Sequence, residues 1–175
     1  MSQLLSIPLS DSDIKEYLGN DAKILKYSEL NKYHSIDELL PNTKDFAVIL
    51  YENSLNNGHW TCICRPKENE IVYFDSYGGV VDKPLSWSSK DVKLGLGEDV
   101  KYLSNLLDKC EEDVFYNKHK YQSGKENVSD CGRYVVCYIL KMKAGYSLND
   151  FCKFIKNECK KMNSSNDIVI CKLIP

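Results

Sequence analysis

The sequence is poor in several features that would narrow its function at once. It has only 5 prolines and 9 glycines in 175 residues, with no linker-like run of either and no internal repeat. We therefore expect one domain over residues 1–175. The formal net charge of −2 gives no overall attraction to nucleic acid or to a membrane surface. No stretch approaches the roughly 18 apolar residues of a membrane span, and a secretory signal pattern is missing, so we expect neither membrane association nor secretion.

The eight cysteines allow disulfides, but the missing secretory pattern favours reduced thiols, most of them in the core. No second Cys/His pair stands at zinc-site spacing from Cys62 and Cys64, so we expect no metal site. Cys110 follows a charged helix end and is a candidate for intermolecular oxidation or for covalent attachment of a cofactor.

The apolar pattern predicts an α+β fold, with a small mixed or antiparallel sheet flanked by helices. We expect a short capped helix between Leu9 and Gly19. Further helices are expected at residues 35–40, 98–110, 133–144 and 147–160. Strands are expected at residues 22–27, 46–51, 60–64, 71–74, 114–116 and 167–171, and the second, third and fourth of these as a compact meander.

Cys131 is the leading candidate for a nucleophile. It follows a polar loop and precedes the apolar run Tyr134–Leu140, which predicts a buried helix. A thiol at a helix N-terminus lies at the positive end of the peptide dipoles, and this favours the thiolate. Gly132 leaves room for a substrate carbonyl beside the backbone N–H groups.

A cysteine nucleophile needs a base, a group that orients the base, and donors for the oxyanion. The chain has only 3 histidines. If residues 59–64 and 71–75 pair as a hairpin, His59 and Asp75 become neighbours, and the carboxylate can hold one tautomer of the imidazole. Gln122 lies nine residues before Cys131 and offers a side-chain N–H₂ to the oxyanion beside the Cys131 N–H.

Less specific interpretations of the same residues remain open. His59 fits an ordinary hydrogen-bonded histidine at a strand edge, and Asp75 fits a turn-capping carboxylate. Gln122 fits a solvated loop residue, and Cys131 fits an inert core thiol.

The order of the motifs resembles that of a known protease group. The matching segments include Gly58-His59-Trp60, Phe74-Asp75-Ser76-Tyr77-Gly78, Tyr121-Gln122 and Cys131-Gly132-Arg133-Tyr134. They resemble the adenovirus-type maturation proteases and their relatives, the SUMO and ubiquitin-like-protein proteases. Within that group the sequence is most similar to the short viral enzymes of virophages and Polinton-like elements.

The resemblance covers about residues 8–145 and implies a papain-like arrangement in permuted order. It implies Cys131 as nucleophile, His59 as its base, Asp75 as the orienting carboxylate and Gln122 as an oxyanion donor. Trp60 and Gly132 would border the substrate, with Trp60 also excluding water. Many relatives place the glutamine closer to the cysteine than the nine residues found here.

The function implied is a cysteine endopeptidase that cleaves viral capsid or scaffold precursors at Gly-containing sites during virion maturation. We accordingly expect a monomer in the virion and the infected cell, with no required cofactor and no membrane partner. A DNA or acidic-peptide activator, as adenovirus-type relatives use, stays open. The alternatives are a protease for ubiquitin-like proteins, a non-catalytic binding module and an acyltransferase on the same scaffold.

Overall fold

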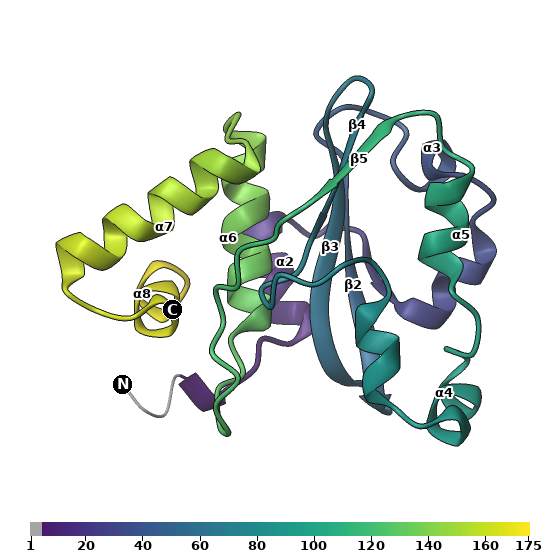
Figure 1. The fold of residues 1–175 in the computed structure, drawn as a ribbon, viewed down its shortest axis with the longest axis horizontal. Helices are drawn as coiled ribbons and strands as arrows, with labels where there is room; N and C mark the ends of the chain where they lie inside the picture. The colour runs from purple at the N-terminus through teal and green to yellow at the C-terminus, as the bar shows by residue number, and fades with distance from the viewer. Residues whose placement is uncertain (1–4) are drawn as a thin grey trace.

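A computed structural model describes residues 5–175, and these build one five-stranded mixed sheet between two layers of helices (Figure 1). The strand order is β1-β2-β3-β4-β5, which follows the chain. The bounds are β1 Ile24–Lys26, β2 Phe46–Ser54, β3 Asn57–Lys67, β4 Glu70–Phe74 and β5 Asp113–Tyr116. Strands β2, β3 and β4 are antiparallel, whereas β1 is parallel to β2 and β5 is parallel to β4. The predicted α+β class is confirmed.

The central meander depends on two tight turns. Asn56 and Asn69 each take a left-handed backbone, with φ of 60° and 61°, and asparagine tolerates this conformation better than most residues. Cys62 pairs with Phe74 in the β3–β4 ladder. The residues before Cys62 and those after Phe74 therefore lie at the same end of the hairpin.

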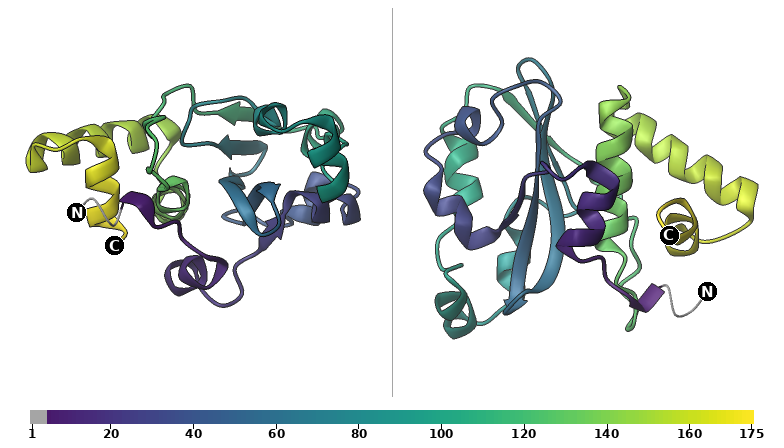
Figure 2. Two further views of the ribbon diagram at one scale, coloured as in Figure 1. Left: turned by 90° about the horizontal axis from the view of Figure 1, so that it is seen from below. Right: turned by 180° about the vertical axis from the view of Figure 1, so that it is seen from behind.

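One face of the sheet is covered by the helix that begins at the candidate nucleophile. This helix, α6 (Cys131–Lys143), packs on β3 and is surrounded by α2 (Asp11–Leu18), α7 (Leu148–Met162) and α8 (Asn166–Leu173) (Figures 1 and 2). Every residue of α6 from Cys131 to Ile139 is buried. Burial on all sides fixes the start of α6 relative to the sheet.

The opposite face of the sheet carries shorter helices and a second apolar core. These helices are η1 (Tyr27–Lys32), α3 (Ile36–Leu39), η2 (Lys83–Trp87), α4 (Lys90–Leu96) and α5 (Tyr102–Asp108) (Figure 1). Within residues 5–175, no helix is both long and apolar enough to cross a bilayer.

The strand predicted at residues 167–171 is wrong, because this segment is the helix α8. Val169 is buried as well, but the buried positions Asp167, Ile170, Cys171 and Ile174 follow i, i+3, i+4, i+7 spacing. That spacing is helical, and a short run of branched apolar residues does not distinguish the two structures by itself. Packing against α6 and α7 selects the helix.

The helix predicted at residues 98–110 is shorter than expected, and the elements η2 and α4 directly before it were not predicted. Helix α5 covers only Tyr102–Asp108. Helix α4 begins after Ser89, whose hydroxyl accepts the Val92 N–H, and ends at Gly97 with φ of 74°. Glu98 therefore lies between two helices, and its carboxylate accepts the Glu52 N–H at 2.7 Å.

Candidate active site

His59 and Asp75 meet at the end of the β3–β4 hairpin. The imidazole Nε2 lies 2.8 Å from Asp75 Oδ1, and the two residues are only 8% and 0% exposed. Asp75 Oδ1 also accepts the Tyr77 N–H at 2.9 Å. The Asn117 side chain bonds the Asp75 N–H at 3.0 Å and the Asp75 carbonyl at 2.6 Å. Asn117 thus fixes the backbone of Asp75, and the Tyr77 N–H fixes its carboxylate.

Two aromatic rings enclose the imidazole. Tyr77 stacks on His59 with ring centroids 5.0 Å apart, and Trp87 meets it edge-on at 5.3 Å. Because Nε2 is bonded to Asp75, Nδ1 is the ring nitrogen that can take the proton of the Cys131 thiol. Burial alone would lower the pKa of the imidazole, but the hydrogen bond to Asp75 and the interaction with Cys131 raise it from 6.5 to about 10.

Cys131 is the first residue of α6 and is 6% exposed. Its Sγ accepts the Trp60 backbone N–H at 3.4 Å. Burial alone would raise the pKa of this thiol. The hydrogen bond and charge of His59, together with the N–H groups of Trp60 and Gly132, outweigh burial and lower it. The arrangement favours a thiolate–imidazolium pair.

Gln122 is held close to these groups by a strand-end serine. Its Oε1 accepts the Ser76 hydroxyl at 2.7 Å, while the Ser76 carbonyl accepts the Tyr121 and Gln122 N–H groups at 2.8 and 3.1 Å. The Nε2 has only a long contact of 3.5 Å to the Val128 carbonyl. The amide oxygen is therefore engaged, and the amide N–H₂ is the end that is available to a ligand.

His59, Gln122 and Cys131 share a groove of about 290 Å³, whose walls include Tyr77, Trp87 and Pro8. Neither Trp60 nor Gly132 is among the described residues that line it. The Trp60 indole N–H donates to the Leu9 carbonyl at 3.0 Å. A Cβ on Gly132 would come within 3.1 Å of the Trp60 ring. These two residues, predicted to border the substrate, pack behind the nucleophile.

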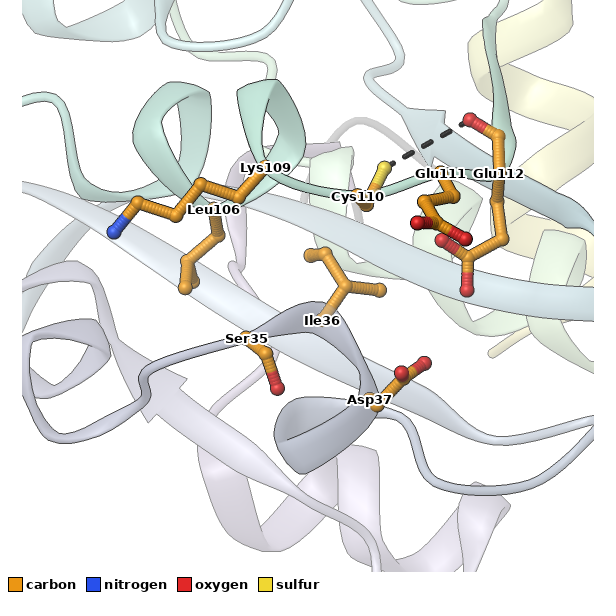
Figure 3. A pocket seen from close by; sticks show the side chains of 8 residues that line it. All are labelled: Ser35, Ile36, Asp37, Leu106, Lys109, Cys110, Glu111 and Glu112. Carbon is orange, nitrogen blue, oxygen red and sulfur yellow. Dashed lines mark hydrogen bonds between the residues drawn. The ribbon is translucent and has the colours of Figure 1, made fainter.

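A second hollow, of about 330 Å³, lies between α3 and the end of α5 (Figure 3). Ile36 and Leu106 extend into it, and the Cys110 Sγ contacts the Glu112 carbonyl at 3.8 Å. Burial and the Glu112 carboxylate raise the pKa of the Cys110 thiol. Cys110 therefore ionises less readily than Cys131, and this hollow holds none of the groups that surround Cys131.

Ser76, Asn117 and Trp87 support the site, but the sequence did not assign them roles. Ser76 stands in a matching segment, yet its hydrogen bond and that of Asn117 depend on how the loop of residues 117–130 returns to β4. Trp87 ends a 3₁₀ turn that is held by Asp82, which accepts the Tyr51 hydroxyl at 2.9 Å. No regular spacing marks such a turn.

Comparison with known proteins identifies a viral relative. No family model matches the chain. The uncharacterized protein V9 of Sputnik virophage is 31% identical over 164 residues, which span 94% of this chain and 92% of V9. The chain belongs to the V9 family. This relative confirms the expected similarity to a virophage protein.

Among solved structures, the chain is similar to the C-terminal Ulp1 protease domain crystallised in complex with Smt3, the yeast ortholog of SUMO. The identity is 19% and the TM-score 0.48, over 99% of this chain and 77% of that chain.

Proposed function

We propose that this V9-family chain is a cysteine peptidase with Cys131 as nucleophile. The observation that supports it most directly is the buried set of Cys131, His59 and Asp75, with the pKa of the thiol lowered and that of the imidazole raised. Such opposite shifts in neighbouring groups are typical of catalytic sites.

In the proposed reaction, the Cys131 thiolate attacks a peptide carbonyl and forms a tetrahedral intermediate. The developing oxyanion accepts hydrogen bonds from the Cys131 N–H and from the Gln122 N–H₂. His59 then donates its proton to the leaving amine as the C–N bond breaks, which leaves a thioester. A water molecule, deprotonated by His59, hydrolyses the thioester and restores the thiolate.

The proposed substrates are viral capsid or scaffold precursors with glycine around the cleaved bond. The rings of Tyr77 and Trp87 border the groove next to His59. A substrate backbone that passes between such walls favours glycine, which has no side chain to collide with them. We further propose that the protein acts in the virion and in the infected cell.

The test is incubation of the purified chain with the capsid precursors of the virus that encodes it. Wild type is expected to cut at a glycine-containing site, and Cys131→Ala is expected not to. Cys110→Ala is the matched control and should cut like wild type. Fusions to SUMO and ubiquitin run in parallel, and cleavage of these alone would replace the capsid substrate with a ubiquitin-like one.

Alkylation by iodoacetamide tests the nucleophile without a substrate. Mass spectrometry should find Cys131 modified faster at pH 6 than Cys110, because only Cys131 has a neighbouring imidazolium. Equal, slow modification of both thiols would contradict the proposed function.

A further inference from the structure

The residue directly before the nucleophile has an unusual environment. Asp130 is 0% exposed, and neither of its carboxylate oxygens has a hydrogen-bond donor in residues 5–175. It occupies the N-cap position of α6, but its side chain does not cap the helix. An ionised carboxylate buried without a donor is strongly unfavourable, so this side chain requires a specific explanation.

The explanation lies on α8. The Asp167 carboxyl group is within hydrogen-bonding reach of Asp130. Asp167 accepts the Tyr134 hydroxyl at 3.0 Å and the Ser123 N–H at 3.3 Å. Two ionised carboxylates cannot donate to each other, but one proton between them supplies the missing bond. Burial and the Asp167 charge raise the pKa of Asp130 to about 8.

This carboxyl pair connects the two parts of the proposed oxyanion site. Asp130 precedes Cys131, and Ser123, whose N–H is held by Asp167, follows Gln122. On its other side Gln122 is held by Ser76. The contact between the two carboxyl groups thus links the backbone that carries the thiol to the backbone that carries the amide.

We propose that Asp130 and Asp167 share one proton, and that this hydrogen bond positions Gln122 relative to Cys131. The inference rests on the proposed function. Both aspartates are positioning residues, since neither lines the groove. When the proton is lost, two like charges repel each other and a negative charge stands beside the thiolate. Turnover then falls, while substrate binding in the groove is largely unchanged.

The groups that face the pair do not neutralise it. Cys171 and Tyr134 have pKa values raised by burial and by both carboxylates. Arg133 is the nearby cation, and its guanidinium donates to the carbonyls of Ile174 and Ile7 at 3.0 and 2.6 Å. Tyr77 and Cys131 also interact electrostatically with the pair.

The first experiment measures stability and needs no catalytic activity. The parent is Cys131→Ala, unfolded in urea between pH 5 and 9. The folded pair keeps a proton that the unfolded chain loses above its ordinary carboxyl range, so the parent loses stability as pH rises to about 8. Adding Asp130→Asn removes this titration, because the amide N–H₂ donates to Asp167 at every pH and does not titrate.

The urea midpoint of the Asp130→Asn variant should therefore rise relative to the parent up to about pH 8 and then stay constant. Asp108→Asn, which removes one exposed carboxylate on α5, is the matched control and should follow the parent. The same pH dependence in Asp130→Asn and in the parent would overturn the shared proton.

The second experiment measures hydrolysis of a fluorogenic Gly-Gly peptide amide from pH 6 to 10. Wild-type kcat should fall about tenfold from the plateau at pH 9, one unit above the titration of the pair, with little change in KM. Asp130→Asn, and independently Asp167→Asn, should stay active until His59 loses its proton near pH 10. An unchanged alkaline limb in both variants would contradict the positioning role.

The two experiments separate the two proposals. If no variant hydrolyses peptide and Cys131 alkylates slowly, the proposed function fails, and the urea series still decides whether the proton is shared.

Discussion

The Asp75 carboxylate has few hydrogen-bond partners for a buried charge. Its Oδ1 faces His59 and the Tyr77 N–H, while Oδ2 has no donor among the described residues. The charge of Asp75 therefore depends on a protonated His59 for its stabilisation. In return, the Asp75 carboxylate keeps His59 protonated while Cys131 is ionised.

Asp75→Asn should break this dependence. The amide no longer stabilises the imidazolium, so we expect kcat to fall about 10²- to 10⁴-fold. Alkylation of Cys131 at pH 6 should become slower than in wild type and should rise more steeply toward pH 9. The reason is that the thiol loses its charged partner. Asp108→Asn serves as the control, and a wild-type alkylation profile in Asp75→Asn would contradict this role of the carboxylate.

The elements bring these residues together through close packing at the start of α6. A Cβ on Gly132 would lie 3.1 Å from the Trp60 ring and 3.2 Å from the Leu9 Cβ. The Trp60 backbone N–H in turn donates to the Cys131 Sγ. A small change in packing at this point therefore reaches the nucleophile.

Gly132→Ala should push α6 away from β3. We expect a loss of about 1–3 kcal/mol of unfolding free energy and a lower kcat, measured by urea unfolding and peptide hydrolysis. Gly95→Ala is the matched control inside α4, where a Cβ would meet nothing within 4 Å. It should be neutral or stabilise by about 0.5–1 kcal/mol. Equal effects of the two substitutions would refute the packing argument.

The two C-terminal helices begin differently, although both follow a serine. Ser147 forms a capping box with Asp150, whereas the Ser165 side chain makes no capping hydrogen bond. Ser147→Ala should cost about 1 kcal/mol, and Ser165→Ala less than about 0.5 kcal/mol. Thermal or urea unfolding measures both, and the reverse order would show that the caps are misassigned.

At the scale of the molecule, the site joins the sheet to the helix layer on one of its faces. His59 and Asp75 come from the β3–β4 hairpin and Cys131 from α6, which share one apolar core. We expect the fast alkylation of Cys131 at pH 6 to disappear at the same urea concentration as the circular dichroism of the fold. Loss of fast alkylation at a clearly lower urea concentration would mean that the layers separate before the core unfolds.

The sequence was sufficient where local rules and tertiary structure agree. The strand patterns and the turn at Asn69 lead to the β3–β4 hairpin, and the hairpin places His59 beside Asp75. The sequence was insufficient for α8, because its short apolar run fits a strand or a helix until α6 and α7 are in place. The pairing of Asp130 with Asp167 depends on that helix, so no local pattern predicts it.

Segments near both ends of the described residues hold the neighbourhood of Cys131. The carbonyls of Ile7 and Leu9 accept Arg133 and the Trp60 indole, and the Ile174 carbonyl accepts Arg133 as well. During synthesis the ribosome makes residue 7 long before residue 174. The hydrogen bonds around the nucleophile are complete only once residue 174 has emerged, so a chain that stops short of it lacks the finished site.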